Sequence, residues 1–405
     1  MTSPQRFSLA PIFLAIFIDM LGVGIALPVT APMLLSPDAT IIPADASEAF
    51  RTIMVGCVLA AFPFAAFFGG PILGAMSDKY GRKKVLILSL TGTLIGYLIF
   101  ALGIHVHSLA LLFLSRLIDG FTGGNIPVIQ SAIADISNAQ TRAKNFGLIG
   151  MAFGLGFILG PYIGGKLSDP TLVSWFDFKT PFLFAAAISF INILLLIFYF
   201  RETLTKRRDM PINALTGFRN IRQAFTDPQL RVMFLAIFFC ALGFNFFAQF
   251  FQVYLIKKFS FTQGDIGDYF AFVGICIAVV QGWLVRKVAK YYSPQQVLHY
   301  SLFALGCVLF SMLLPTQVWQ VYLVVPFMAI AQGLSAPNMT SIVSESAPPE
   351  AQGNMMGINQ SVSSVALTIP PVIAAFADLI NIHLPIILAS CFLMIGWRLM
   401  LAYLR

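Results

Sequence analysis

The stretch GAMSDKYGRKK, residues 74–84, carries five charged residues between two long apolar runs, Cys57–Met76 and Val85–Leu102. At about 1.5 Å of rise per residue, each run is roughly long enough to cross a bilayer core of about 30 Å. Four of the five charges are basic, which places this connection on the cytoplasmic side under the positive-inside rule. The chain is therefore expected to be a membrane protein with a tight inner turn at this point.

The composition of the whole chain agrees with this expectation. Of 405 residues, 58% are hydrophobic and only 10% are charged, whereas soluble domains carry roughly 25% charged residues. The net charge of +8 occurs as short basic blocks between apolar runs, a pattern of membrane topology rather than of a nucleic-acid partner. The sequence contains no nucleophile–base pair, no Cys-x-x-Cys pair and no metal-ligand cluster, so we predict neither an enzyme nor a cofactor.

Twelve apolar runs follow one another in two groups of six, separated by a basic stretch at residues 201–229. We therefore predict an all-α integral membrane protein with twelve transmembrane helices. They would form two pseudo-symmetric six-helix bundles, residues 1–200 and 230–405, joined by a cytoplasmic linker. The runs fall near residues 7–30, 51–76, 84–104, 109–134, 145–166, 181–200, 230–256, 265–285, 296–315, 319–342, 353–377 and 383–403.

The distribution of basic residues predicts the orientation. With the N-terminus inside, 18 of the 25 Lys and Arg residues fall in inner segments and 5 in outer segments, while Arg116 and Arg398 lie within helices. Both termini are therefore expected in the cytoplasm. The first run, Phe7–Val29, contains Asp19 and is too long for the apolar part of a cleavable signal peptide, so it is interpreted as the first transmembrane helix.

Two carboxylates lie well inside predicted helices. A carboxylate such as Asp19 at mid-membrane costs about 2.5–3.5 kcal/mol on insertion scales, which favours a functional role over a polar spot in a packing helix. Arg116 and Asp119 are three residues apart and can pair, either as a self-neutralised structural pair or as part of a cavity or switch. Because Asp19 has no basic neighbour in its own helix, it is the better candidate to carry a proton, and Asp119 with Arg116 is the second.

Residues of the stretch at 74–84 have separate expected roles. Gly74 is expected to allow two helices to approach closely, and Gly81 to allow a backbone turn closed to most residues. Asp78 and Arg82 can pair with each other or with neighbouring helix ends. We expect them to meet Asp135 at the inner end of the fourth helix and to act there as a conformational latch.

The fifth apolar run contains a dense glycine pattern. Gly156, Gly160 and Gly164 recur every four residues and give one smooth face for close helix contact. The full pattern consists of Gly147, Gly156, Gly160, Pro161, Gly164 and Gly165, in which the proline allows a bend. The segment also mimics a phosphate-binding loop, but Leu167 stands where Ser or Thr is needed, so nucleotide binding is rejected.

Ten amide side chains lie within the predicted helices and are candidates to line a small-molecule cavity among Phe and Met side chains. Part of this set is expected only to bond between helices, at about 0.6 kcal/mol each. The second group of runs has no mid-membrane carboxylate, so no fixed negative charge is expected to hold a ligand there. The ten are Asn125, Gln130, Asn245, Gln249, Gln252, Gln281, Gln332, Asn338, Asn359 and Gln360.

Several of these motifs resemble those of the major facilitator superfamily of secondary transporters. The order Gly-x3-Asp-Lys-x-Gly-Arg-Lys-Lys from Gly74 resembles the family's loop between helices 2 and 3. The spacing Arg116-x3-Gly120 is similar to its helix-4 motif, whose arginine is linked to proton transfer. The glycine pattern of the fifth run is similar to the signature of the antiporter branch. Over residues 15–166 the chain resembles tetracycline/proton antiporters and related twelve-helix drug exporters.

The resemblance implies a protein of the inner, cytoplasmic membrane that exports hydrophobic small molecules, in the manner of multidrug efflux, against inward proton flow. Its partners would be the small-molecule substrate, protons and the lipid bilayer, with the proton gradient as energy source and no bound cofactor. A monomer is expected. Two alternatives stay open on the sequence alone: the same fold moving a metabolite or siderophore, and a membrane receptor that keeps the fold without transporting.

Overall fold

The computed structural model describes residues 10–36, 41–137, 142–204, 213, 215–346 and 352–404. Within these ranges the chain forms helices, turns and short connections, and no strand. An all-α structure follows from long apolar runs, because a backbone in hydrocarbon must satisfy its hydrogen bonds within its own segment or within a closed barrel.

The helices fall into an earlier and a later set, with α8 (Thr216–Thr226) between them. The earlier set consists of α1 (Ala10–Leu35), α2 (Glu48–Tyr80), α3 (Arg82–His105), α4 (Leu109–Gly123), α5 (Ile126–Asp135), α6 (Arg142–Leu167) and α7 (Thr180–Tyr199). The later set consists of α9 (Pro228–Phe259), α10 (Gln263–Val279), the π-helical turn η2 (Val280–Leu284), α11 (Val285–Val288), α12 (Pro294–Ser311), α13 (Val318–Glu345), α14 (Gln352–Ile380) and α15 (Leu384–Leu404).

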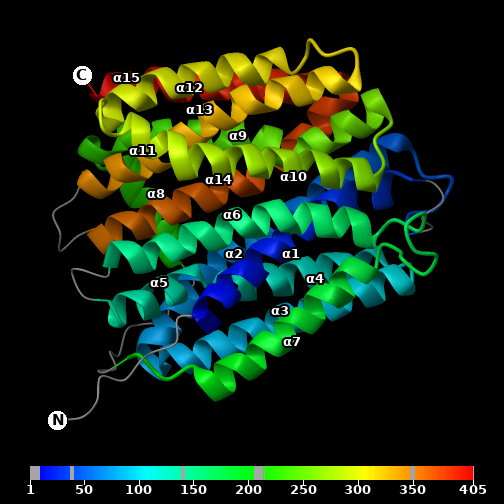
Figure 1. Ribbon diagram of the computed structural model, residues 1–405, viewed down its shortest axis with the longest axis horizontal. Coiled ribbons are helices and arrows are strands. Elements are labelled where there is room, and N and C mark those ends of the chain that lie inside the picture. The colour runs from blue at the N-terminus through cyan, green and yellow to red at the C-terminus, as the bar shows by residue number, and fades with distance from the viewer. Residues whose placement is uncertain are drawn as a thin grey trace.

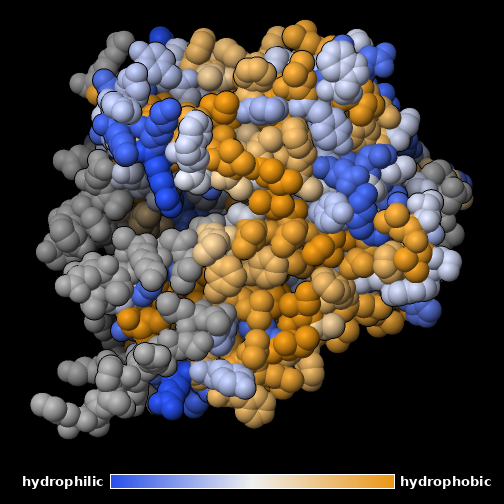
Figure 2. All heavy atoms as spheres, in the orientation of Figure 1, coloured by the Kyte–Doolittle hydropathy of each residue, from blue (hydrophilic) through white to orange (hydrophobic). Residues whose placement is uncertain are grey.

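Nine of the helical segments in the described ranges are long and apolar enough to cross a membrane. The other three apolar runs of the sequence correspond to α6, α12 and the pair α4–α5. Figure 2 shows apolar surface over most of the face in view, with hydrophilic surface gathered mainly toward its margins. Large apolar side chains such as Leu88, Phe198 and Leu323 are more than half exposed, as expected for helices that face lipid.

The two sets of helices pack side by side (Figure 1). In the earlier set α1 packs on α6 and α7, and α3 packs on α4 and α7. In the later set α9 packs on α14 and α15, and α12 on α13 and α15. The sets meet chiefly through two pairs, α2 against α14 and α6 against α10.

Local sequence explains where several helices begin. Ser47 and Ser108 cap α2 and α4 by accepting a hydrogen bond from a backbone N–H of the first turn. Thr262 with Asp265 at the start of α10, and Ser293 with Gln296 at the start of α12, form capping boxes. The connections α9–α10 and α11–α12 are therefore short and well defined.

The fourth apolar run differs from the prediction of one helix over 109–134, because the helix breaks between Gly123 and Ile126. Pro127 lies in the first turn of α5, where its missing N–H is tolerated. In an unbroken helix its ring would clash with the carbonyl four residues earlier. At the break a Cβ on Gly124 would lie 2.7 Å from the backbone nitrogen of Gly70 on α2. The break therefore places irregular backbone against α2 in the middle of the earlier set.

Close packing of α2 occurs at different glycines from the one predicted. A Cβ on Gly74 would meet only the Cβ of Pro127, at an ordinary 3.7 Å, so the expected close approach at Gly74 is wrong. Instead, a Cβ on Gly69 would lie 2.0 Å from the carbonyl oxygen of Phe121, and a Cβ on Gly120 would lie 2.2 Å from that of Phe62. The close α2–α4 contact thus lies at residues 62–69, about one to three turns nearer the start of α2 than Gly74.

Candidate functional site

Asp19 lies near the middle of α1 and is buried, with 4% of its surface exposed. Among the residues that the structure describes, neither of its carboxylate oxygens makes a hydrogen bond of good geometry. The amide of Asn125 and the charge of Asp119 are its polar neighbours. A buried carboxylate without a partner is costly to keep. Its burial in the core therefore indicates a functional role for Asp19 rather than a structural one.

Tyr97 on α3 is a neighbour of Asp19 that the sequence analysis missed. Its ring is fully buried, and its hydroxyl occupies the space where a Cβ on Gly22 would be, 1.5 Å away. The charges of Asp19, Asp119 and Arg116 all act on this hydroxyl. The absence of a side chain at Gly22 therefore leaves room for the Tyr97 hydroxyl against α1, one turn from Asp19. This hydroxyl lies within electrostatic range of both Asp19 and Asp119.

Arg116 and Asp119 form the pair expected from their spacing. Nη2 of Arg116 lies 3.1 Å from Oδ2 of Asp119, and both side chains are only 3% exposed. The guanidinium also lies over the rings of Phe100 at 4.8 Å and Phe182 at 5.8 Å. Nε and Nη2 make no hydrogen bond with the residues that the structure describes, so the contact with Asp119 is an ionic one.

Asn125 lies at the break between α4 and α5 and is fully buried. Its amide nitrogen donates to the hydroxyl of Ser89 at 2.7 Å, and that hydroxyl donates to the carbonyl of Thr122 at 2.7 Å. Within the described ranges its amide oxygen has no hydrogen-bond partner. Gln130 on α5 is exposed and does not join this group.

The glycine pattern of α6 holds this helix directly against α1. A Cβ on Gly156 would lie 2.5 Å from the Cβ of Met20, one on Gly160 would lie 2.7 Å from the carbonyl oxygen of Leu21, and one on Gly164 would lie 2.8 Å from that of Ile25. These contacts cover the turns of α1 directly after Asp19. The predicted smooth face therefore exists, and α1 is its partner.

Gly165, the last residue of the same glycine pattern, packs against the later set of helices. A Cβ on Gly165 would lie 2.6 Å from the carbonyl oxygen of Gln263, and one on Gly267 would lie 2.8 Å from that of Pro161. α6 is thus held between α1 and α10 by backbone contacts on both sides. Gly147 lies in α6 among residues whose side-chain surroundings are outside the described part of the structure.

Arg82 organises the end of the molecule where α2 meets α3, called here the Gly81 end. Its guanidinium lies 2.7 Å from Oδ1 of Asp78 and 3.2 Å from Oδ2 of Asp135, and it donates to Ser77 at 2.5 Å. Gly81 has a φ of 108°, a value that L side chains rarely adopt, which supports the expected turn.

Glu202, just after α7, completes this cluster and was not found from sequence. Its carboxylate accepts from the backbone N–H groups of Arg82 at 2.9 Å and Lys83 at 3.2 Å. The hydroxyl of Thr203 donates to Asp135 at 3.2 Å. In the described residues all these partners belong to α2, α3, α5 and the segment after α7, so the cluster braces the earlier set internally.

The opposite end, called here the Lys166 end, carries ion pairs that join the two sets. Lys166 on α6 contacts Asp268 on α10 at 2.9 Å. Lys257 on α9 contacts Asp378 on α14 at 2.7 Å and Glu48 on α2 at 2.7 Å. The sequence analysis placed the two lysines in outer segments but did not predict their partners. Among the described residues, the ion pairs between the sets all lie at this end.

The amides of the later set do not share one environment. Gln249 donates to the carbonyl of Leu367 on α14 at 2.9 Å, and fully buried Gln252 has an unpartnered Oε1. Two others bond within their own helix, Asn245 to Ala241 and Asn338 to Leu334. The rest are half-buried (Gln332, Asn359) or exposed (Gln281, Gln360). Of these amides, Gln249 bonds to another helix, while Gln252 donates to the carbonyl of Gln249 in its own helix.

Apolar helices that bury charged groups in their middles and pack through bare glycine faces define a multi-pass membrane protein of the transporter class. The chain belongs to the Major Facilitator Superfamily, whose sequence profile matches residues 12–371. This agrees with the resemblance noted in the sequence. The protein is therefore a transporter with a small-molecule substrate, and not an enzyme.

The relatives of the chain include resistance proteins. It is 30% identical to the tetracycline resistance protein of class E from Escherichia coli, over 89% of this chain and 85% of the relative. It is 26% identical to multidrug resistance protein 2 of Bacillus subtilis, over 96% of this chain and 93% of the relative. The fold is also that of a human organic anion transporter, with a TM-score of 0.75, 22% identity, and coverage of 98% of this chain and 100% of the other.

Proposed function

We propose that the protein is a proton-coupled antiporter that exports hydrophobic small molecules by alternating access. In this proposal it acts as a monomer in the inner membrane. Its twelve membrane spans form two halves, residues 1–200 and 230–405, joined by a linker at residues 201–229. Both termini lie in the cytoplasm. The observation that supports it best is Asp19, a buried carboxylate in the core of a transporter, for which the described ranges of the chain supply no hydrogen-bond partner. The resistance proteins among its relatives support export of drugs.

Proton entry supplies enough free energy for such export. Moving one proton inward across 100 mV releases about 2.3 kcal/mol, which corresponds to roughly a fiftyfold concentration ratio of an uncharged substrate. The pair Arg116–Asp119 and Tyr97 lie within electrostatic range of one another beside Asp19. We therefore assign the proton to Asp19, with Arg116 and Asp119 adjusting to the change in its charge.

Backbone contacts between helices would connect protonation of Asp19 to the change between inward-open and outward-open states. α1 is held on α6 at Gly160, and α6 is held on α10 at Gly165 and Pro161. Because no flexible side chain lies at these contacts, a shift of α1 on protonation would move α6 against α10. The ion pairs at the Lys166 end would then open. The Arg82 cluster, which here lies within the earlier set, would latch the outward-open state by engaging the later set at the Gly81 end.

The direct test measures efflux of a fluorescent hydrophobic drug from energised cells that express the wild type or Asp19→Asn. Expected is loss of energised efflux in Asp19→Asn at normal expression. Asp45→Asn is the matched control, since Asp45 is exposed in the loop before α2 and its neutralisation should leave efflux intact. Equal efflux by wild type and Asp19→Asn would contradict the assignment of the proton to Asp19. If neither transported the drug, hydrophobic drugs would be excluded as substrates.

A further inference from the structure

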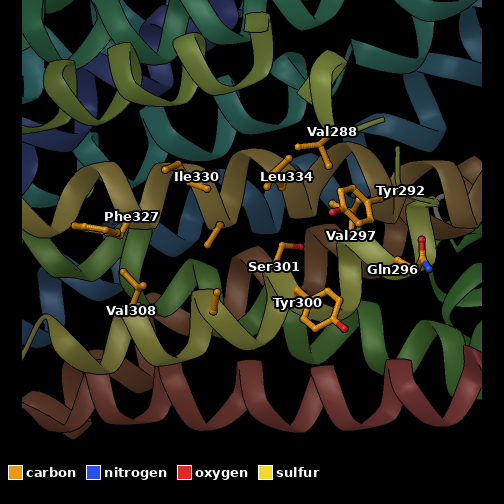
Figure 3. Close-up of a pocket in the computed structure, with 12 residues that line it drawn as sticks. Val288, Tyr292, Gln296, Val297, Tyr300, Ser301, Val308, Phe327, Ile330 and Leu334 are labelled. Atoms are coloured by element: carbon orange, nitrogen blue, oxygen red, sulfur yellow. The ribbon is translucent and has the colours of Figure 1, made fainter. Parts of the chain in front are cut away.

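A long groove opens between α12 and α13 on the outside of the later set, away from the buried charges. It has a volume of about 590 Å³, and apolar side chains make up most of its lining. Figure 3 shows Phe327, Ile330 and Leu334 along one side and Val308 and Val297 along the other, with Val288 near one end. None of the ten amides predicted to line a cavity contributes to it.

The groove has the length and chemistry of an acyl-chain site. From Val297 to Val308 it follows α12 for 11 residues, about 16 Å at 1.5 Å per residue. The serine hydroxyls at its floor are engaged within the protein, because Oγ of Ser335 lies 2.9 Å from Oγ of Ser301 and 2.8 Å from the carbonyl oxygen of Ala331. Phe327 is 59% exposed beside it, so the groove lies open to the surrounding hydrocarbon.

One end of the groove reaches a cluster of basic and aromatic residues. Arg286, Lys287 and Lys290 are exposed on and just after α11, within five residues of Val288 or Tyr292 in the lining. No ion pair holds any of the three within the described part of the chain. Figure 2 shows hydrophilic surface in the region of α11 directly beside apolar surface.

The open end of the groove also has exposed tyrosines, a residue type typical of the lipid headgroup region of a bilayer. Tyr292 and Tyr300 line the groove and are 58% and 70% exposed. Tyrosine is enriched where a bilayer meets water, since its ring is apolar and its hydroxyl is polar. An apolar channel, exposed tyrosines and a basic cluster thus follow one another in the order of a phospholipid's chain, glycerol region and phosphate.

We propose that this groove binds one anionic phospholipid, with an acyl chain between α12 and α13 and its phosphate on Arg286, Lys287 and Lys290. Basic clusters beside grooves between membrane helices hold anionic headgroups electrostatically, and a zwitterionic lipid gains little from them. A free hydrophobic drug could enter the apolar part but would leave the basic cluster unused. The lipid would support α11 and η2, where the π-turn already marks an irregular part of α10.

Native mass spectrometry of the full-length protein in neutral detergent tests the proposal. The probes are phosphatidylglycerol and phosphatidylcholine with identical acyl chains, titrated separately. At about fivefold per basic side chain, three charges predict roughly a hundredfold preference for phosphatidylglycerol, saturating at one lipid per protein. The triple variant Arg286→Gln/Lys287→Gln/Lys290→Gln should remove the preference, and Ala304→Phe, which fills the groove, should weaken retention of both lipids.

A second triple variant provides the matched control. Lys84, Arg201 and Arg231 are exposed basic residues on three separate elements, and their replacement by Gln removes the same charge without touching the groove. The proposal is overturned if this control loses phosphatidylglycerol as strongly as the groove triple does. Equal retention of both lipids by wild type, or full retention of phosphatidylglycerol by Ala304→Phe, would also overturn it. So would displacement of the lipid from wild type by an uncharged drug at equal concentration.

Discussion

At the scale of single residues, the two buried carboxylates differ in what holds them. Asp119 has an ion-pair partner in Arg116 at 3.1 Å, whereas the described part of the chain gives Asp19 no ion-pair partner and no well-formed hydrogen bond. Removing one member of a buried ion pair strands the other charge, at about 3–5 kcal/mol. Neutralising Asp19, whose polar neighbours are the amide of Asn125 and the charge of Asp119, strands no opposite charge. The same chemical change at the two positions therefore has different consequences for stability.

We predict that Asp119→Asn lowers the thermal midpoint of the purified protein markedly, because Arg116 is left buried and unpaired. Asp19→Asn should leave the midpoint unchanged or raise it. A thermal-shift measurement in one detergent compares both variants with wild type. Strong destabilisation by Asp19→Asn would show that the carboxylate has a structural partner, contrary to its observed surroundings.

Gly22 provides a second prediction at this scale. A Cβ at this position would lie 1.5 Å from the hydroxyl of Tyr97, so Gly22→Ala should destabilise the protein by about 1–3 kcal/mol through overpacking. Adding Tyr97→Phe removes the clashing oxygen and should restore part of the loss. Thermal midpoints of the single and double variants measure this. Purely additive effects would contradict the direct contact.

At the scale of helices, sequence and structure agree where the signal is local. Long apolar runs predicted the helices, and Gly156, Gly160 and Gly164 predicted a contact face on α6. The break after Gly123 was also encoded locally, by Pro127, but a single apolar run concealed it. Tyr97 and Glu202 could not be found this way, because Gly22 lies 75 residues from Tyr97 and Arg82 lies 120 residues from Glu202. Only the packed fold brings these pairs together.

The α1–α6 contact gives a prediction about a whole element. Gly160→Ala would place a Cβ 2.7 Å from the carbonyl of Leu21 and 2.8 Å from Cα of Gly24, so the two helices must separate. Transport should fall at least tenfold in reconstituted vesicles. Gly154→Ala is the control on the same helix, since a Cβ there meets nothing within 4 Å. Equal activity of the two variants would contradict a mechanical role for this contact.

At the scale of the whole molecule, the sets of helices are held together by ion pairs at the Lys166 end. Alternating access requires that these contacts open in every cycle. In a background without Cys57, Cys240, Cys276, Cys307 and Cys391, the pair Lys166→Cys/Asp268→Cys should block transport under oxidation and recover on reduction. Each single cysteine variant is the control. Full transport with the crosslink formed would show that this end stays closed throughout.

The central claim is that Asp19 couples transport to protons, and one measurement in proteoliposomes tests it most directly. A hydrophobic drug is followed across the membrane with and without an imposed proton gradient, for wild type and Asp19→Asn. The account predicts gradient-driven accumulation by wild type, and only equilibration down the drug's own gradient by Asp19→Asn. Accumulation by Asp19→Asn to the wild-type level would contradict it.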